Sequence, residues 1–337
     1  MTLLEKYWKI DVMIITVQRG APLANPRTAP PQPVPGPATY ILHERAREYY
    51  GEGTGTLSIK SFFGGQAFYD IGRGRYRLDE QSYLIVNHGQ PYAITIDSST
   101  EVESFCIFFE AGFADEVRRS LLTPADRVLL DPEARASAPV TFVERSYPHD
   151  QTLSPALFHL RTQLAYRPVE QDWLNEQLHA VMQLLLQVHR RVYEEMEQLP
   201  AARAATREEL YRRLHLAKDY VDASFDQAIT LTEVASVAGL SPNHLLRMFK
   251  QLFQQTPYQY ITARRLERAQ HLLRLTDRSV TEICFSVGFE SPGSFSWLFR
   301  RHTGRTPTAY RRQTGDFEEA LFPPIPYTGR GASTSNG

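Results

Sequence analysis

The sequence predicts an α+β protein of two domains, in which a strand-rich jelly-roll barrel with following helices precedes an all-helical domain of two helix-turn-helix units joined by a linker helix. Three observations predict this fold class. Short runs rich in Ile, Tyr, Phe and Val, punctuated by glycine, fill residues 38–110. An imperfect repeat occupies about Thr230 to Tyr310. Basic residues concentrate in the last third, although the 337-residue chain has a formal net charge of −1.

The N-terminal segment, residues 1–37, is expected to be a flexible extension. Seven prolines between residues 21 and 37 favour an extended, mobile chain. Residues 1–20 are either a short docking element or the result of a start codon placed too far upstream, and they lack the apolar core of a signal peptide. With two cysteines and no apolar run long enough to cross a bilayer, the chain is expected in a reducing cytoplasm and not in a membrane.

Residues 38–150 are predicted to form the barrel, because many short strands at regular spacing are typical of a jelly roll. The expected strands are 56–63, 66–71, 82–86, 92–96 and 103–109. Candidate aromatic residues for an effector pocket are Phe62, Phe68, Tyr76, Tyr83 and Tyr92. Arginines near the strand ends offer partners for an acidic effector, or are solvated hairpin edges: Arg45, Arg47, Arg73, Arg75 and Arg77.

Enzymatic chemistry is not expected of the barrel. A metal-dependent barrel enzyme needs two closely spaced histidines and a carboxylate that converge on one ion. This segment has only His43 and His88, far apart, and no His-x-His pair. We therefore predict no metal, no cofactor and no catalytic residue, and an enzyme with an appended helical domain remains the rival that this reasoning disfavours.

Residues 151–198 are expected to form two helices, about 154–166 and 169–197. The second carries a long apolar stripe that includes Leu178, Val181 and Leu185. Two interpretations stay open, a homodimer contact and a simple cover for the barrel. Residues 199–206 show little apolar periodicity and are expected to be the linker to a domain at 207–312, and residues 313–337 a disordered tail.

The repeat is visible in residue types and spacing. Thr232, Glu233 and Gly239 recur 49 residues later, whereas Phe249, Thr256, Pro257 and Tyr260 recur 50 residues later, because one residue is added in the second turn. Each copy begins with an S/T-x-x-E capping box, reaches a glycine that ends the first helix, and starts the second helix with Ser-Pro. Two such helices on one rigid body can enter successive turns of a DNA major groove.

Helical spacing divides each second helix into two faces. The predicted core face holds Leu245, Met248, Phe249 and Leu252 in the first copy, and Phe295, Leu298, Phe299 and His302 in the second. The other face is predicted to meet DNA, with Asn243, Leu246, Arg247 and Lys250 in the first copy, and Gly293, Ser296, Trp297 and Arg300 in the second. Asparagine can pair with adenine and arginine with guanine.

A linker helix from Pro257 to about Thr276 is predicted to space the two copies. About 20 residues at 1.5 Å each span about 30 Å, close to one DNA turn. Its arginines Arg264, Arg265 and Arg268 are expected to face outward. Residues 207–312 contain sixteen Lys and Arg against ten Asp and Glu, so the neutral total conceals a basic domain.

The motifs from Gly239 to Lys250, Thr256-Pro257, Gly288 to Ser291 and Thr306-Pro307 with Tyr310 resemble the AraC/XylS family of bacterial transcription regulators. The resemblance implies base reading by Asn243, Leu246, Arg247, Gly293, Ser296 and Trp297. Expected phosphate contacts are Lys250, Thr256, Arg300, Arg301 and Arg305. Gly293 has no side chain, and Trp297 stands where the family commonly has a polar residue that contacts bases. We therefore expect the first unit to discriminate between DNA sequences and the second chiefly to contribute affinity.

The strand-rich region also resembles the cupin-type sensor of many such regulators. This implies a ligand-responsive regulator that binds promoter DNA as a homodimer, in which a small-molecule effector in the barrel changes the arrangement of the domains and so which DNA sites the dimer can span. Activation, with RNA polymerase as a partner, is implied by the resemblance alone. The alternative is a ligand-independent DNA-binding protein whose barrel is purely structural.

Overall fold

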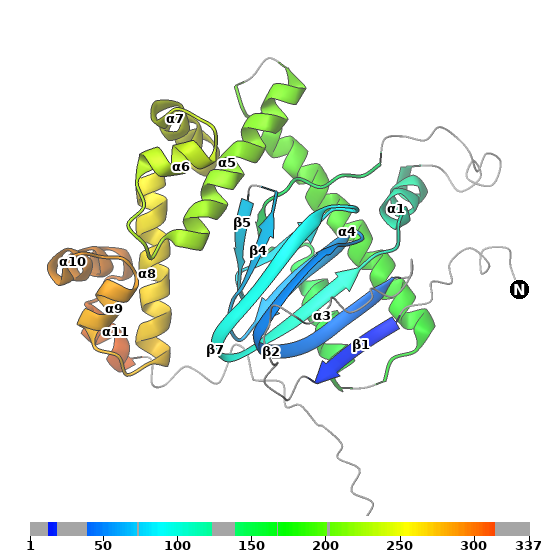
Figure 1. Cartoon of the computed structure of the whole chain (residues 1–337), viewed down its shortest axis with the longest axis horizontal. Coiled ribbons are helices and arrows are strands. Elements are labelled where there is room, and N and C mark those ends of the chain that lie inside the picture. Colours follow the sequence, from blue (N-terminus) through cyan, green and yellow to red (C-terminus); the bar gives the residue numbers. More distant parts are fainter. Residues whose placement is uncertain are drawn as a thin grey trace, which may run out of the picture.

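The computed structural model describes residues 13–18, 39–72, 74–122, 139–166, 168–200 and 203–313. These residues form a nearly closed barrel, three helices packed around it, and a helical domain beside it (Figure 1). The strands are β1 Met13–Gln18, β2 Tyr40–Thr54, β3 Ser58–Phe63, β4 Ala67–Ile71, β5 Gly74–Leu78, β6 Ser82–Val86, β7 Pro91–Phe108 and β8 Ser146–Pro148.

The helices begin with α1 beside the barrel and end with the repeated units. Those around the barrel are α1 Phe113–Leu122, α3 Ser154–Tyr166 and α4 Gln171–Glu197. Those of the helical domain are α5 Ala204–Ser224, α6 Leu231–Val237, α7 Pro242–Phe253, α8 Pro257–Leu275, α9 Val280–Ser286, α10 Pro292–Thr303 and α11 Pro307–Gln313. None of the described helices combines the length and apolar character that a membrane span requires.

A long bent ribbon of β2 and β7 builds the barrel. The two strands pair antiparallel from Tyr40 opposite Phe108 to Thr54 opposite Pro91, with a register shift between Ala46 and Glu48. One half of β7 pairs with β3, which continues to β6 and β8, while the other half pairs with β4, which continues to β5. The bend therefore turns one ribbon into two facing layers.

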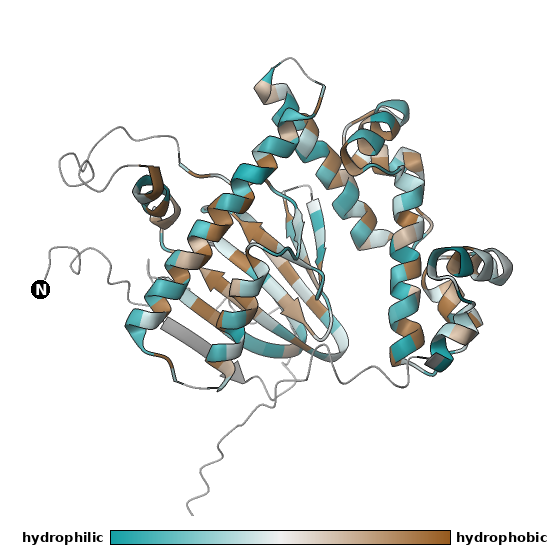
Figure 2. Cartoon of the chain, turned by 180° about the vertical axis from the view of Figure 1, so that it is seen from behind, coloured by the Kyte–Doolittle hydropathy of each residue, from teal (hydrophilic) through white to brown (hydrophobic). Residues whose placement is uncertain are grey.

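Alternation along the strands separates two apolar cores. One set of side chains fills the space between the layers, for example Phe62, Tyr69 and Leu84. The opposite set, for example Ile59, Ile85 and Phe105, packs against the helices. Figure 2 shows α4 lying across the back of the sheet, where it covers this second set.

The apolar stripe of α4 is used inside the chain. Leu178, Val181 and Leu185 are each at most 1% exposed and belong to the core between the helices and the sheet. The outward positions of α4 are polar, among them Gln183, Gln187 and Arg190. Leu178, Val181 and Leu185 therefore cover the barrel and are not on a surface that a second copy can reach, which corrects their assignment to a dimer contact.

Several elements differ from the sequence-based expectation. The two strands expected at 92–96 and 103–109 are halves of one strand, β7, because the polar stretch between them continues the pairing as the ribbon bends. Strand β2 was not expected, and neither was α1. Residues 13–18, placed in the flexible extension, pair parallel with β2. The rest of residues 1–37 and the tail beyond residue 313 lie outside the described residues.

A buried polar joint connects the barrel to α5, which begins at Ala204, inside the expected linker. The backbone nitrogen of Ser146 in β8 donates to Asp219 at 3.2 Å, and the Ser146 hydroxyl donates to the same carboxylate. One guanidinium nitrogen of Arg145 lies 2.9 Å from Nε2 of His215 and contacts the Tyr211 hydroxyl. The helical domain is therefore docked on the barrel edge.

Candidate nucleic-acid interface

The first helix-turn-helix unit consists of α6 and α7, and its helices begin where the caps predict. The Thr230 hydroxyl accepts from the Glu233 backbone nitrogen at 3.2 Å, and the Thr230 nitrogen donates back to the Glu233 carboxylate at 2.6 Å. Ser241 caps α7, followed by Pro242 at its first position. Each such cap stabilises a helix start by about 1 kcal/mol. The capping box predicted from sequence is confirmed.

The second unit, α9 and α10, repeats this construction. Ser279 and Glu282 exchange the same two bonds, at 3.1 and 2.7 Å, and Ser291 with Pro292 starts α10. Gly239 and Gly288 end the first helices with φ of 62° and 90°. At Gly288 a Cβ would lie 2.8 Å from the Asp226 carbonyl oxygen, so a side chain is excluded there by sterics as well as by backbone conformation.

The predicted reading face of α7 is exposed. Asn243, Leu246, Arg247 and Lys250 are all accessible, and Leu246 is 40% exposed. The opposite face buries Leu245, Met248 and Phe249 completely or nearly so, with Leu252 partly buried. An exposed leucine among polar groups is available to a thymine methyl group, and Asn243 and Arg247 are available to base edges.

The equivalent face of α10 is less polar. Gly293 is exposed, Ser296 is half-buried, and Trp297 is 60% exposed with the Arg301 guanidinium 5.3 Å from its ring centroid. Phe295 and Phe299 form the buried face. His302, expected in the core, is exposed. The core stripe of this helix is one turn shorter than that of α7, because a polar histidine stands at the position where the first copy has Leu252.

The expected phosphate contacts lie at the ends of these helices. Lys250, Arg300, Arg301 and Arg305 are exposed. Thr256 is half-buried and caps α8, exchanging bonds with Gln259 at 2.9 and 3.3 Å. Figure 1 shows α7 and α10 on the side of the helical domain away from the sheet. The faces predicted to meet DNA are therefore accessible in the docked arrangement.

Each unit is held by one preceding helix, a relationship that the sequence reasoning missed for α5. The Tyr260 hydroxyl donates to Asp222 of α5 at 2.7 Å, and its ring packs on Phe249. Its repeat partner Tyr310 donates to Gln270 of α8 at 3.1 Å and packs on Phe299. The recurrence of tyrosine at positions 260 and 310 was the signal in the sequence for this arrangement. A buried hydroxyl needs a hydrogen-bond partner, and in each case the helix that precedes the unit supplies it.

The arginines of α8 face inward, not outward as expected. Arg264 pairs with Asp222 at 2.8 Å and donates to Gln81 of the barrel at 2.8 Å. Arg265 donates to the carbonyl oxygens of Phe225 and Gln227 at 2.6 and 2.8 Å. Arg268 is half-buried. These residues hold α8 to α5 and to the barrel, so part of the basic charge of the domain is structural.

The five aromatic residues proposed for an effector pocket do not converge. Phe62 and Tyr76 are buried in the interior core, and Tyr92 packs against the same core. Tyr83 belongs to the other core, where its ring stacks on Tyr147 at 5.4 Å. Phe68 is half-buried under Arg75. Strand alternation places Tyr83 on the opposite face from the interior, which corrects the grouping of these five residues.

Lys60 is the residue of the barrel interior that sequence reasoning missed. Its side chain is almost completely buried, with Nζ 3.4 Å from the ring centroid of Phe108 and 5.3 Å from that of Tyr92. Burial lowers the pKa of Lys60 to about 8. The only signal in the sequence was a lysine at an inward position of a strand whose neighbours Ile59 and Phe62 are apolar.

The candidate histidines lie apart. Nε2 of His43 is 2.8 Å from the Glu103 carboxylate, which also binds Arg45 and Arg161, whereas His88 is exposed in a turn. Hydrogen bonds from His43 and Arg161 hold the pKa of Glu103 well below its usual range against the opposing effect of burial. Across the described ranges, no group of three His, Cys, Asp or Glu side chains gathers as a metal site. Arg73 lies outside the described residues.

Comparison with known proteins places the likeness in the repeated units. A family model described as a helix-turn-helix domain matches residues 234–313. The melibiose operon regulatory protein of Escherichia coli (strain K12) is 34% identical over 93 residues, which are 28% of this chain and 31% of that protein. The regulatory protein SoxS of Salmonella typhimurium is 38% identical over 95 residues, which are 28% of this chain and 89% of that protein. The chain thus matches about a third of the melibiose protein and most of SoxS.

A solved DNA-binding domain is also similar in sequence. The DNA-binding domain of AdpA, a global transcriptional factor solved in complex with a target DNA, is 30% identical and covers 30% of this chain and 90% of its own, with a TM-score of 0.29.

Proposed function

Because this chain belongs to the AraC family of DNA-binding transcription regulators, we propose that it binds promoter DNA through α7 and α10 and regulates the genes beside its site. The single observation that carries the proposal is the pair of exposed faces at equivalent positions of two repeated units, joined by one continuous helix, α8. Successive major grooves on one side of DNA are about 34 Å apart, and α8 spans about 28 Å.

The proposed contacts divide by chemistry. Asn243, Leu246 and Arg247 read bases in one major groove, and Ser296 and Trp297 line the next, where Gly293 permits close approach of the backbone. Phosphate contacts come from Lys250, Thr256, Arg300, Arg301 and Arg305. The family model matches residues 234–313, which include all of these positions, and SoxS, 38% identical over 95 residues, is called a regulatory protein.

Selection from a random double-stranded DNA library tests this proposal. We expect enrichment of a site with one strongly preferred segment and a weaker one about 10 base pairs away. Replacing Asn243 and Arg247 with alanine is expected to remove the preference for the stronger segment. The matched control is Arg75→Gln on the barrel, which leaves the preference unchanged. Enrichment of no site, or an unaltered preference in the double variant, contradicts the proposal.

The barrel is proposed to hold a small-molecule effector and to change how the helical domain is presented. Support comes from Lys60, a cation enclosed by aromatic rings, which is a partner suited to an acidic effector. Thermal-shift screening against sugars, organic acids and aromatic acids, repeated with Lys60→Met, tests it. The expected hit raises the midpoint of the wild type only. If no compound acts, the rival of a structural barrel packed by its own aromatic residues is favoured.

We further propose that the protein acts in the cytoplasm as a homodimer and activates transcription by contacting RNA polymerase, as the family resemblance implies. The contact between copies would lie outside the buried stripe of α4. Sedimentation at micromolar concentration tests the assembly, and a reporter gene downstream of the selected site tests the sign of regulation. A monomer at all concentrations, or a reporter that falls when the protein is expressed, contradicts the corresponding part.

A further inference from the structure

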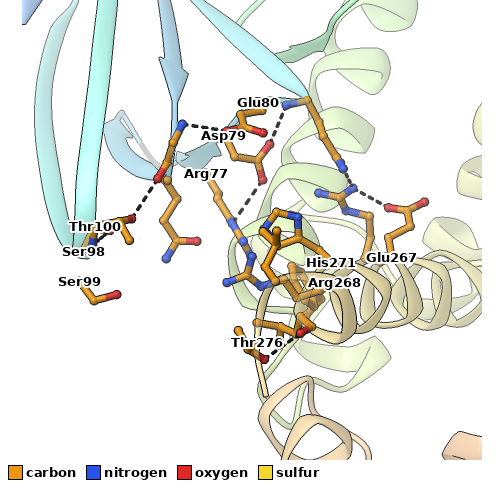
Figure 3. A pocket seen from close by; sticks show the side chains of 18 of the residues that line it. Arg77, Asp79, Glu80, Ser98, Ser99, Thr100, Glu267, Arg268, His271 and Thr276 are labelled. Carbon is orange, nitrogen blue, oxygen red and sulfur yellow. Dashed lines mark hydrogen bonds and ion pairs between the residues drawn. The ribbon is translucent and has the colours of Figure 1, made fainter. Parts of the chain in front are cut away.

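A cleft of about 600 Å³ separates the open end of the barrel from α8. Its barrel side includes Arg77, Ser98 and Thr100, and its other side includes Arg268 and His271 (Figure 3). This volume is typical of sites for small metabolites. The cleft is distinct from the barrel interior around Lys60 and from the faces of α7 and α10.

Arg77 has an unsatisfied hydrogen-bond donor in this cleft. Its side chain is 8% exposed, yet its Nε has no hydrogen-bond partner. The nearest carboxylate oxygen, Oδ2 of Asp79, lies 3.8 Å from Nε, too far for a hydrogen bond, and the guanidinium carbon is 5.0 Å from the ring centroid of Phe225. A buried guanidinium donor without an acceptor costs free energy unless a ligand or water supplies one.

Three of the four carboxylates that line the cleft accept hydrogen bonds from groups other than Arg77, although Asp79 also forms the long ion pair with Arg77. Glu80 accepts from the Gly64 backbone nitrogen at 2.8 Å, and Asp79 accepts from the Gln81 nitrogen at 3.0 Å. Glu267 accepts from Arg264 at 2.7 Å. Among the described residues, no carboxylate lies within 4 Å of the guanidinium groups of Arg268 or Arg278, which line the same cleft. Four arginines and four carboxylates line the cleft, but Arg268 and Arg278 have no described carboxylate at contact distance.

The ionisation of these arginines agrees with this geometry. Burial lowers the pKa of Arg77, Asp79 acts in the opposite direction, and Arg268 and Arg264 lower the pKa further. Burial also lowers the pKa of Arg268. A second anionic group placed between them would relieve the repulsion between the two arginines.

We propose that this cleft binds a small multivalent oxyanion, with Arg77 of the barrel and Arg268 of α8 as its two main contacts. A multivalent ligand fits because the two cations come from opposite walls of the cleft. Since one ligand then bridges both domains, binding stabilises the docked arrangement of barrel and α8. The carboxylates of an organic acid and the oxygens of a phosphate share this chemistry.

Isothermal titration of the full chain at constant ionic strength tests the proposal, with citrate, inorganic phosphate and acetate as probes. Saturable binding of citrate or phosphate at one site per chain is expected, with acetate at least tenfold weaker. The stronger of the first two identifies the source of the oxyanion. No saturable binding of either overturns the proposal.

Variants locate the site. Arg77→Gln and Arg268→Gln are each expected to weaken binding at least tenfold, and Arg268→Gln carries the test alone if the first variant does not fold. The matched control is Arg75→Gln, two residues away on the same outer face of β5 with a side chain 55% exposed, which keeps wild-type affinity. Arg247→Ala also keeps it, because that arginine lies on the proposed DNA face. Equal loss in Arg75→Gln, or loss only in Arg247→Ala, overturns the assignment, while DNA binding measured without the anion tests the proposed function separately.

Discussion

The two helix-turn-helix units share their caps, glycine turns and Ser-Pro starts, but they are attached to the molecule differently. The core of the first unit, with Leu245 and Phe249, is continuous with α5, α4 and the sheet. The core of the second, with Phe295 and Phe299, is a separate cluster closed by α8 alone. Similar sequences thus form one unit whose core is shared with the barrel side of the protein and one that is carried on a single helix.

The exposed faces of α7 and α10 also differ, in the side chains that they present. The first unit presents an amide and a guanidinium at Asn243 and Arg247, and the second presents Gly293 and Trp297. The unit that presents these two side chains is therefore also the one whose core is continuous with the barrel through α5. A structural change in the barrel, or in its joint with α5, is expected to affect the packing of the first unit directly and that of the second unit only through α8.

Core truncation is expected to give the largest difference between the units. Phe249→Ala and Phe299→Ala each remove a fully buried ring and should cost about 3 to 5 kcal/mol of local stability. Hydrogen exchange read by mass spectrometry is expected to show increased exchange in α4, α5 and α7 for the first variant. For the second, the increase is confined to α8–α11. The same pattern in both variants would contradict the division into a shared and a separate core.

The stability of the joint between the barrel and α5, which carries the first unit, is expected to depend on pH because of Asp219. Burial raises the pKa of Asp219 from 3.8 to about 6, so the folded state binds the proton more tightly than the unfolded state does. The stability from this group is present below about pH 4 and is lost as pH rises through 6. Urea titrations should show that Asp219→Asn becomes more stable relative to wild type by about 2 to 3 kcal/mol between pH 4 and pH 7.5.

A matched substitution separates this effect from general charge. Asp226 lies just beyond the end of α5 and is exposed, so Asp226→Asn should shift stability equally at both pH values. If Asp219→Asn shows no more pH dependence than this control, the buried carboxylate does not weaken the joint.

Base readout should differ between the units by a smaller amount. Arg247→Ala is expected to lose about 1 to 3 kcal/mol at one base step and to relax the preference there, whereas Trp297→Ala should weaken binding to all sequences alike. Fluorescence anisotropy with single-base variants of the selected site measures both. Lys250→Ala serves as the comparison, because loss of a phosphate contact lowers the salt slope by about 0.9 without changing preference. Stronger base preference at the second segment would reverse the assignment.

The smallest expected difference concerns the ends of the recognition helices. Gln254 ends α7 with φ of 58°, while its repeat partner Gly304 ends α10 with φ of 78°. A left-handed conformation costs a residue with a Cβ about 1 kcal/mol, so Gln254→Gly should raise stability by about 0.5 to 1 kcal/mol. Gly304→Gln is the reciprocal variant and should lower it. A destabilised Gln254→Gly would mean that the bond from its side chain to Gln251 outweighs the backbone strain.

The helical domain was predictable because its signals are local. A cap such as Thr230 with Glu233, a left-handed glycine and an apolar stripe each act within a few residues, and the repeat supplied every signal twice. The reading-face residues Asn243 and Arg247 followed from helical spacing alone and are exposed as expected.

The rest depends on contacts between distant segments. Strand β2 contains Gly51, Gly53 and several charged residues, so its extended form is stabilised chiefly by 14 described residues pairing with β7. The inward orientation of Arg264 depends on Asp222 of α5 and Gln81 of the barrel. The cleft needs residues near 77, 98 and 268 together, and no spacing rule within one helix or strand connects them.

Because α8 is one continuous helix that belongs to both units, its number of residues determines how the two units are placed relative to one another. It serves as the last helix of the first unit, through Tyr260, and as the supporting helix of the second, through Leu266 and Leu273. Inserting one residue in its middle would advance everything beyond it by about 1.5 Å and turn it by about 100°. The face of α10 predicted to meet DNA would then point in a different direction from that of α7, so α8 should tolerate substitutions at its exposed positions but neither insertions nor deletions.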